Sequence, residues 1–176
     1  NAAATAFRPM LEQKAHNVER TFAISVQSFV AAVQAAVPLM QGRPGRVVAI
    51  SGIDSHQAMT GHGVLGAAKA ALEGLVRALA MELGPLGITV NGVSPGLVET
   101  DSAQTYVERG ISERYREAVE RVIALTPVRR AGTGADVADL VAYLASDAAG
   151  FLTGQTIIID GGLTTVSPLH RLHVGF

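Results

Sequence analysis

Apolar residues recur at helical spacing through residues 8–42, and this pattern predicts a helix in two pieces. The apolar positions fall on one broad stripe, at Phe22, Val26, Phe29, Val30, Val33 and Val37. Asn17 is a residue type that favours a helix N-cap, so we expect the helix to begin there. Pro38 and the run from Gly42 to Gly45 end the helical pattern.

Three short apolar runs alternate with helical segments along the rest of the chain. Residues 47–50, 88–93 and 156–159 are expected to form buried strands, and residues 61–83 and 135–146 carry helical periodicity. Strands that alternate with helices usually form a parallel sheet covered by helices. The pattern therefore predicts an α/β fold.

The composition fits one domain that binds a small molecule. The chain has 176 residues, 48% of them hydrophobic, and a net charge of −1 that gives no reason to expect nucleic acid. The absence of cysteine is typical of a reducing compartment and excludes thiolate chemistry. Gln34 and Pro38 interrupt the apolar runs, so we expect no membrane-spanning helix and a cytoplasmic protein. No histidine pair has metal-ligand spacing, so we expect no metal site.

Several motifs, in the correct order, resemble those of the short-chain dehydrogenase/reductase family. They are Asn1-Ala-Ala, Gly66-Ala-Ala-Lys69-Ala-Ala-Leu72, Pro95-Gly96-Leu-Val-Glu-Thr100 and Gly154-Gln-Thr-Ile-Ile-Ile-Asp160-Gly-Gly162. The resemblance implies a Rossmann-type, doubly wound parallel sheet in a three-layer α/β/α arrangement. It also implies that residues 1–176 are a single domain, the C-terminal two-thirds of the family's fold, without the Gly-rich phosphate-binding turn that lies upstream of these motifs.

The resemblance implies NAD or NADP as cofactor, with the choice between them left open. The residues implied in cofactor binding are Asn1, Ala2 and Ala3 near the adenine ribose, Ile50 and Ser51 at the end of a strand beneath nicotinamide, Lys69 on the nicotinamide ribose, and Pro95, Gly96, Leu97, Val98 and Thr100 around the carboxamide. Strand C-termini are where open α/β sheets bind ligands.

The family's usual catalytic side chains are missing around Lys69. The tyrosine that normally donates a proton stands four residues before the lysine, where this chain has Leu65. The family's serine position corresponds to Gly52, with Ser51 one residue away, and the family's helix asparagine corresponds to Ser25, which could still hold a water. Ordinary ketone or alcohol chemistry is therefore not expected.

His62 stands seven residues before Lys69, where the resembled enoyl-thioester reductases carry their tyrosine. In conjugate reduction, negative charge gathers on the thioester oxygen, so a hydrogen-bond donor aimed at that oxygen is the main requirement. Imidazole can donate in its neutral or its cationic form, although the Lys69 cation nearby disfavours the latter. The alternative is a loop histidine with no chemical duty, and both interpretations stay open.

Residues 102–125 form a charged segment that also has two interpretations. Its acidic and basic residues fit an exposed helix held by i,i+4 ion pairs. In the resembled family the same region closes over nicotinamide and substrate, so it is also expected to act as a lid, with Tyr106 near its start.

The sequence thus predicts an NAD(P)H-dependent reductase of an enoyl thioester, carried by acyl carrier protein or coenzyme A as in fatty-acid metabolism, with Lys69 and His62 as catalytic residues. One alternative is a catalytically impaired family member that binds nucleotide or forms oligomers. Another is a 3-oxoacyl or alcohol reductase with a non-standard proton donor. The family usually assembles through the two long helices beside the site, so a homodimer or homotetramer is expected.

Overall fold

The computed structural model of the chain describes residues 5–100 and 113–167. These residues form two compact units. Unit 1 contains the described residues up to Ser94 together with Asp139–Ile158, and unit 2 contains Pro95–Ala138 and the residues from Ile159 onwards. Each unit is described by itself, and the single domain expected over residues 1–176 stays a prediction.

Unit 1 begins with a nearly continuous helical run. After the 3₁₀ turn η1 (Met10–Glu12), the run comprises α1 (Ala15–Phe22), the π-helical turn η2 (Ala23–Gln27), α2 (Ser28–Ala36) and the 3₁₀ turn η3 (Val37–Met40). The expectation that Asn17 caps the helix is wrong, because α1 starts at Ala15 and Lys14 occupies the N-cap position. The helix begins earlier because Asn17 donates its main-chain N–H to the carbonyl of Lys14 instead of ending a loop.

Two strands and a long helix form the centre of unit 1. They are β1 (Gly45–Ile50), α3 (Gly63–Leu83) and β2 (Ile88–Pro95), with 3₁₀ turns η4 (Ile53–Ser55) and η5 (Gly84–Leu86) on either side of α3. β2 is buried along almost its whole length, as expected of a strand covered on both faces. Strands and helices thus occur in the predicted order, with small shifts at their ends.

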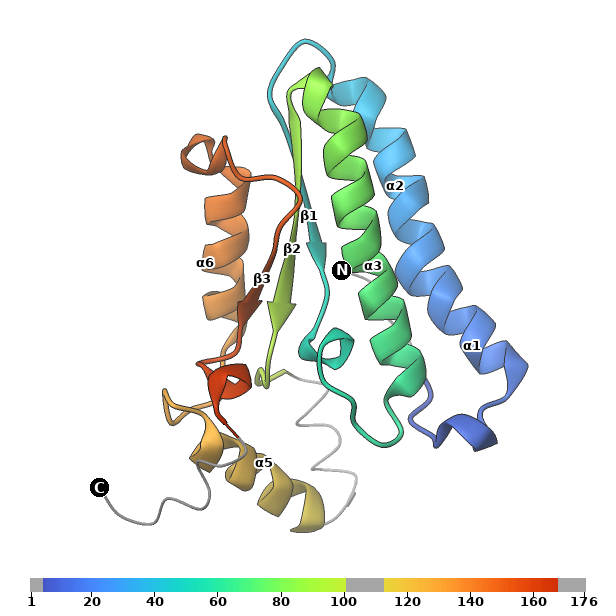
Figure 1. Ribbon diagram of the computed structural model, residues 1–176, viewed down its shortest axis with the longest axis vertical. Coiled ribbons are helices and arrows are strands. Elements are labelled where there is room, and N and C mark those ends of the chain that lie inside the picture. The colour runs from blue at the N-terminus through green and yellow to red at the C-terminus, as the bar shows by residue number, and fades with distance from the viewer. Residues whose placement is uncertain (1–4, 101–112, 168–176) are drawn as a thin grey trace. The chain divides into compact units, whose positions relative to one another are not determined.

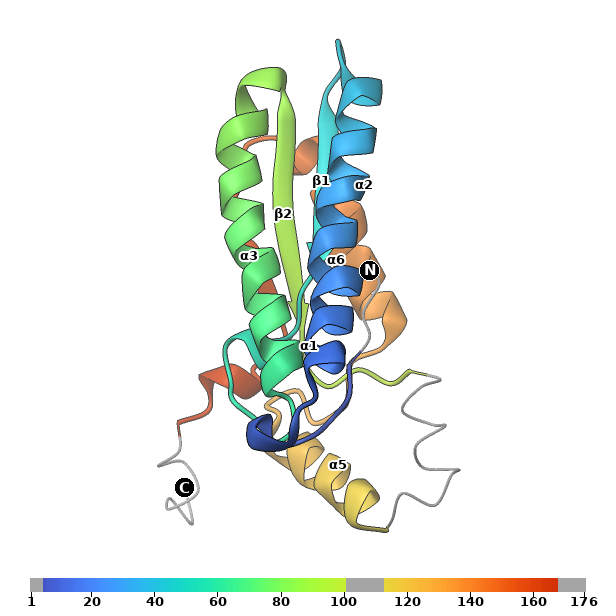
Figure 2. The same ribbon diagram turned by 90° about the vertical axis from the view of Figure 1, so that its right-hand side faces the viewer.

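The sheet has the order β1-β2-β3, and β3 is Thr156–Ile159, the range that the sequence predicts. β1 and β2 run parallel, with Gly45 opposite Ile88 and Ile50 opposite Val93. Figure 1 shows α1, α2 and α3 on one face of these strands and α6 (Gly134–Ala145) on the other. Figure 2, turned by 90°, shows α1, α2 and α3 in front of β1 and β2. The predicted parallel α/β sheet with helix layers on both faces is confirmed.

The hydrophobic core of unit 1 lies between α3, the α2 helix and the strands. Its buried members are Val33, Ala49, Val76, Ala80, Leu83, Ile88 and Val90. On the other side of the sheet, Leu144 of α6 is fully buried. This packing fixes β1, β2 and α3 relative to one another, and the candidate site lies at the C-terminal ends of these strands.

Unit 2 contains α5 (Glu113–Leu125), the first half of α6 and the 3₁₀ turn η7 (Leu163–Thr165), while the 3₁₀ turn η6 (Asp147–Ala149) belongs to unit 1. Glu117 and Arg121 of α5 form an exposed i,i+4 ion pair at 3.6 Å. This supports the exposed-helix interpretation of the charged segment. Residues 101–112, including Tyr106, lie outside the described residues, so the lid stays a prediction.

The helical run Ala15–Met40 is long and apolar enough to cross a membrane by length and composition. This corrects the expectation that Gln34 and Pro38 would prevent any segment from meeting that criterion. The physical reason is that glutamine and proline near the end of a helix leave most of its apolar length intact. The core helix of a soluble protein meets the same criterion, and Val33 of this run is buried in the core. Length and composition alone therefore do not place the run in a membrane.

Candidate active site

Lys69 is a residue of α3, on the helix face that packs against β1. It lies beside the C-terminal end of that strand. Its ammonium Nζ donates a hydrogen bond to the carbonyl oxygen of Ile50 at 2.8 Å, and the residue is buried. Burial lowers the pKa of the Lys69 ammonium from its ordinary value, and the negative charge of Asp54 partly offsets this. The structure thus brings together two of the predicted site residues, Lys69 and Ile50.

His62 occupies the N-cap position of α3, at the start of the same helix. Its ring Nδ1 lies 3.3 Å from Oδ2 of Asp54, and its ring contacts that of Phe7 with centroids 4.4 Å apart. The main-chain carbonyl of His62 accepts the N–H of Gly66, which closes the first turn of the helix. The imidazole is therefore held on one edge by a carboxylate and on one face by an aromatic ring.

A pocket opens between residues 54–59 and the first two turns of α3. His56, His62 and Asp54 line it, together with small residues of α3 that include Gly66 and Ala70. Lys69 is not part of its lining, since its side chain points to Ile50. The structure therefore places His62 in a pocket and Lys69 beside the strand end, with Asp54 close enough to act electrostatically on the lysine.

The buried carboxylate of Glu73 was missed by sequence reasoning. Its Oε1 accepts hydrogen bonds from the hydroxyls of Ser51 at 2.7 Å and Ser55 at 2.5 Å, and Nε2 of His56 lies 3.2 Å away. A carboxylate tolerates burial when such donors satisfy it. Glu73 therefore ties the end of β1 and the following loop to α3, and it commits the Ser51 hydroxyl to a structural contact. The role of Ser51 in cofactor binding stays a prediction.

Gly52 and Leu65 stand at the two positions where the resembled family carries its hydroxyl donors, and neither residue has a hydroxyl group. A Cβ built on Gly52 would meet no atom within 4 Å, and its φ of 175° is extended backbone that any residue adopts. Leu65 is half-buried on the first turn of α3. A larger side chain at position 52 would therefore meet no steric obstacle.

Ser25 lies in the π-helical turn η2, and its hydroxyl is buried with no hydrogen-bond partner among the residues that the structure describes. η2 packs against α3. Buried hydroxyls are normally satisfied by protein or water, and π turns occur often at functional sites. The unsatisfied Ser25 Oγ therefore fits the expectation that it holds a water on the α3 side of the site.

Pro95 ends β2, and the residues after it in unit 2 are those predicted to bind the carboxamide, a role that stays a prediction. A Cβ on Gly96 would lie 2.7 Å from Cβ of Asp160, so only glycine permits this approach. The loop pairs with Gly132, whose main chain exchanges hydrogen bonds with Leu97 and Glu99 at 2.9 Å each. Pro95 to Val98 and Thr100 are thus held in one defined loop, while Asn1, Ala2 and Ala3 lie outside the described residues.

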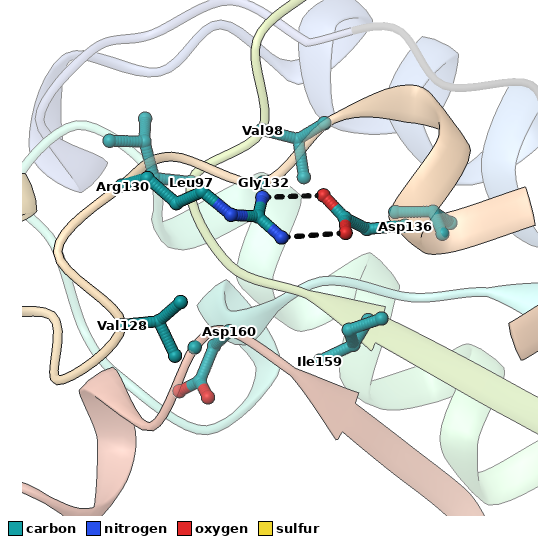
Figure 3. A pocket seen from close by; sticks show the side chains of 10 residues that line it. Leu97, Val98, Val128, Arg130, Gly132, Asp136, Ile159 and Asp160 are labelled. Atoms are coloured by element: carbon teal, nitrogen blue, oxygen red, sulfur yellow. Dashed lines mark hydrogen bonds and ion pairs between the residues drawn. The ribbon is translucent and has the colours of Figure 1, made fainter. Parts of the chain in front are cut away.

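A second pocket, within unit 2, is lined by Leu97, Val98, Ile159 and the carboxylates of Asp136 and Asp160 (Figure 3). Burial alone would raise the pKa of Asp160, but hydrogen bonds from the main chains of Thr164 and Gly162 outweigh it and lower the pKa. Both carboxylates are therefore engaged by the protein itself, and we assign this pocket no ligand.

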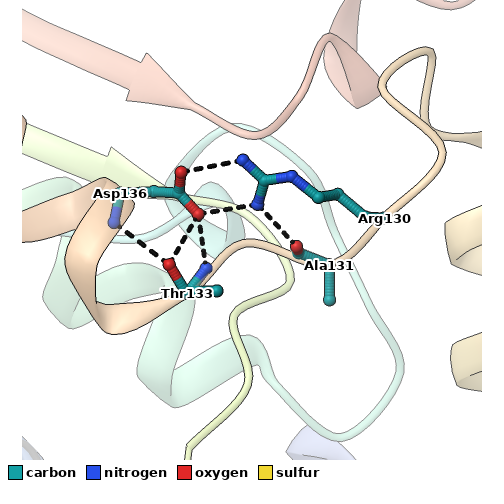
Figure 4. Close-up of polar contacts among 4 residues, drawn as sticks. All are labelled: Arg130, Ala131, Thr133 and Asp136. Carbon is teal, nitrogen blue, oxygen red and sulfur yellow. Dashed lines mark hydrogen bonds and ion pairs between the residues drawn. The ribbon is translucent and has the colours of Figure 1, made fainter.

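Asp136 makes a bidentate ion pair with Arg130, at 2.7 and 2.8 Å (Figure 4). It also accepts the N–H and the hydroxyl of Thr133, while Thr133 Oγ1 accepts the N–H of Asp136, a reciprocal cap at the start of α6. The Arg130 guanidinium, helped by Thr133, holds the pKa of this carboxyl far below its usual range. The cluster fixes the loop that pairs with residues 97–99.

No group of three or more metal-ligating side chains is found among the described residues. Unit 1 offers a buried ammonium, an imidazole beside a carboxylate, and open space at Gly52 after the end of β1.

Known proteins similar to this chain include several reductases. A family model described as enoyl-(acyl carrier protein) reductase matches residues 1–164. The chain is 39% identical over 168 residues to 1-cyclohexenylcarbonyl-CoA reductase of Streptomyces collinus, covering 96% of this chain and 58% of that protein. It is 34% identical over 167 residues to the 3-oxoacyl-(acyl-carrier-protein) reductase FabG of Rickettsia felis, covering 94% and 66%.

Among solved structures, the chain is similar to the NADP-bound structure of ElxO. The TM-score is 0.83 at 25% sequence identity, over 94% of this chain and 66% of the other. The chain thus spans less than two-thirds of the length of each of these relatives.

Proposed function

Because the chain belongs to the short-chain dehydrogenase/reductase family, we propose that it is an NAD(P)H-dependent oxidoreductase that reduces the C=C bond of an enoyl thioester. Family membership and the Rossmann-type fold were both predicted from the motifs, and both are confirmed. The substrate is proposed to be carried by coenzyme A or acyl carrier protein. The observation that carries this proposal is the position of His62. This residue stands seven residues before Lys69, lines a pocket and lies beside the carboxylate of Asp54.

The residues at the strand ends fit a nicotinamide cofactor. Among the described residues, the Lys69 ammonium uses one of its three donors, on Ile50, which leaves two for ribose hydroxyls. The open space beside Gly52 leaves room at the end of β1. Lys69, Ile50, Ser51, the loop from Pro95 to Val98, Thr100 and residues 1–3 are proposed to hold NAD or NADP, which supplies the hydride when bound.

The proposed role of His62 is to stabilise the substrate oxygen. When hydride reaches the β-carbon of an enoyl thioester, the electron pair of the C=C bond moves toward the carbonyl and the oxygen becomes an enolate. Nδ1 of His62 faces Asp54, so Nε2 is the ring nitrogen left for that oxygen, and it donates there when it carries a proton. A donor placed on a developing oxyanion contributes on the order of 10²–10³ in rate.

Reduction of a 3-oxoacyl thioester is the second candidate, favoured by the similarity to the Rickettsia felis reductase. The missing hydroxyls at Gly52 and Leu65 count against it, because a ketone oxygen would need a donor there. A family member that binds cofactor without catalysis is the third. We also propose a cytoplasmic protein that forms a homodimer or homotetramer, with exposed small residues such as Ala67 and Ala78 of α3 allowing close helix packing.

The test is oxidation of NADH and NADPH by the full-length protein with paired enoyl and 3-oxoacyl thioesters of the same acyl chain. Turnover of the enoyl substrate alone is expected. Turnover of the 3-oxoacyl substrate alone would overturn conjugate reduction. No turnover of either, with cofactor bound in a separate affinity measurement, would support the non-catalytic alternative.

A second measurement addresses the donor. His62→Gln should lower kcat for the enoyl substrate by about 10²-fold with cofactor affinity nearly unchanged. His16→Gln is the matched control, because His16 lies on exposed α1 away from the pocket. Equal turnover by His62→Gln and the wild-type protein would remove His62 from the mechanism.

A further inference from the structure

We propose that Phe7, Met10 and Met59 form an apolar rim that holds the acyl group of the thioester and selects among acyl groups by their size. This inference rests on the proposed function, since it places the reacting thioester in the pocket beside His62. None of the three rim residues belongs to a motif of the family resemblance. Two separate segments of the chain bring them together at the start of α3.

The three rim residues lie around the first turn of α3. The Phe7 ring contacts the His62 ring, with centroids 4.4 Å apart. Met10 covers the first residue of the helix, since a Cβ on Gly63 would stand 2.6 Å from the Met10 sulfur. Met59 lines the pocket together with His62 and Gly63. The apolar rim is therefore continuous with the pocket that contains His62.

Hydrogen bonds fix the segment that carries Phe7 and Met10. The main-chain N–H of Arg8 donates to the carbonyl of Gly61 at 3.1 Å, and the side-chain amide of Gln13 donates to the carbonyl of Arg8 at 3.2 Å. A preformed surface binds a ligand at a lower entropic cost than a surface that must first be ordered. The protein itself therefore holds the apolar rim in place.

The rim side chains expose much apolar surface. The exposed fraction is 48% for Phe7, 58% for Met10 and 52% for Met59. Single exposed apolar residues are common on proteins, but a group of them beside a pocket marks a site whose apolar surface a ligand covers. The apolar rim thus extends the pocket outward with a surface suited to an apolar group.

The pocket indicates which part of a thioester meets the apolar rim. Its volume is about 370 Å³, in the range of sites for small molecules. The acyl group of a thioester is apolar, whereas the pantetheine of coenzyme A or acyl carrier protein carries amide and hydroxyl groups. These polar groups would lose hydrogen bonds to water against an apolar surface. The apolar rim therefore favours the acyl group and leaves the carrier toward solvent.

Two methionines make the apolar rim adaptable. Methionine is unbranched, has three rotatable bonds and fills apolar gaps of different shapes. Because Met10 and Met59 are open to solvent, each further carbon of an acyl group gains contact area instead of meeting a closed wall. We therefore expect larger acyl groups to bind more tightly than small ones.

The first test measures kcat and KM of the full-length protein with trans-2-enoyl-CoA esters of four, six and eight acyl carbons, at saturating reduced cofactor. We expect kcat/KM to be at least about tenfold higher for the eight-carbon ester than for the four-carbon ester, because each partly covered methylene group adds a share of its transfer free energy. Turnover that is equal across the series, or that falls with acyl length, would overturn the apolar rim and leave the proposed function intact.

The second test replaces both methionines, as Met10→Gln/Met59→Gln. Glutamine has nearly the length of methionine and a polar end, and both positions are exposed, so the fold should tolerate it. The eight-to-four-carbon ratio of kcat/KM should fall at least about threefold, mainly through KM for the longer ester. A disturbed fold would instead lower kcat for every ester. Met81→Gln, exposed near the other end of α3, is the matched control, and an unchanged ratio in the double variant would overturn the apolar rim.

A binding measurement separates failure of this inference from failure of the proposed function. If no enoyl ester is reduced, butanoyl-CoA and octanoyl-CoA still report on the apolar rim, because binding of these saturated esters needs no reaction. Isothermal titration calorimetry of the full-length protein with cofactor present should show tighter binding of octanoyl-CoA, and Met10→Gln/Met59→Gln should reduce the difference. Equal affinities of the wild-type protein for both esters would overturn the inference. The expected difference without any turnover would support the apolar rim and overturn only the proposed reaction.

Discussion

Gly66 of α3 lies directly against the main chain of Asp54: a Cβ on Gly66 would stand 2.5 Å from the Asp54 carbonyl oxygen. Real Cβ atoms do not approach backbone this closely, so only glycine allows the η4 turn to rest on the first turns of α3. This contact places the Asp54 carboxylate within reach of His62. A residue without a side chain therefore sets the geometry of the pocket.

Gly66→Ala should destabilise the protein by about 1–3 kcal/mol, because a methyl group would push η4 away from α3. Gly74→Ala, in the same helix, is the matched control, since a Cβ there meets no atom within 4 Å. That control should gain about 0.5–1 kcal/mol from helix propensity. Denaturant unfolding measures both, and equal shifts for the two variants would contradict the close contact.

Glu73→Gln should lower the free energy of unfolding by about 1–3 kcal/mol. Its Oε1 accepts from Ser51 and Ser55 and lies beside Nε2 of His56, and an amide keeps an oxygen acceptor there but loses the negative charge that strengthens these contacts. Glu82→Gln changes an exposed residue of the same helix and should have little effect. Thermal unfolding distinguishes the two, and a neutral Glu73→Gln would show that the cluster is not stabilising.

Arg129→Gly should stabilise the protein by about 1 kcal/mol, because Arg129 has a φ of 60°, where L side chains are strained. Its side chain also bonds to the carbonyl of Ala124, so part of the gain is lost with that contact. Arg129→Ala loses the contact and keeps the strain, so it should be less stable than both the wild-type protein and Arg129→Gly. If Arg129→Gly and Arg129→Ala unfold at the same midpoint, backbone strain is not the cause.

Asp136→Asn should lower the Tm at neutral pH, since the ion pair with Arg130 and the cap at Thr133 both need the ionised carboxylate. The folded pKa of Asp136 lies below the unfolded one, so its stabilisation is complete above the unfolded pKa of about 4 and is lost as pH falls toward the folded value. The Tm difference between variant and wild type should therefore shrink below about pH 4. A difference that is constant with pH would contradict this linkage.

The double substitution Gly52→Ser and Leu65→Tyr should introduce the hydroxyl donors whose positions the family resemblance gives. Gly52 has open space and an extended backbone, so serine fits without strain. We expect the ratio of 3-oxoacyl to enoyl turnover to rise at least about tenfold, because general acid catalysis contributes 10²-fold or more. Unchanged selectivity would mean that substrate oxygen does not lie near these positions.

The sequence predicted the elements of the sheet well and the polar contacts of the site poorly. β3 matches its predicted range, and β2 was found because a buried parallel strand is apolar along its length. Lys69 and His62 were named from the family resemblance, which marks positions along one helical segment, and their roles stay predictions. Asp54 and Glu73 were missed because their partners come from other segments, so no spacing along the chain marks them.

The start of the first helix was also misplaced, at Asn17 instead of Ala15. Asn17 has the right side chain for a cap, but its carbonyl accepts the hydroxyl of Thr21 inside the helix. Propensity at one residue is a weak signal when helical hydrogen bonds are available on both sides. The sequence also did not predict the π turn, because one extra residue changes the spacing of the apolar positions only slightly.

The π turn in the first helical run determines which side chains can share a face. Ser28 donates its N–H to Ala23, five residues back, so the turn holds one residue more than an α-helical turn. In an uninterrupted α-helix, Ser25 and Val33 would point about 80° apart. The added residue brings both to the buried side, one polar and one in the core. Deleting one residue between them would remove the π turn and leave seven positions, about 20° apart in a regular α-helix, so both side chains would stay on the buried side.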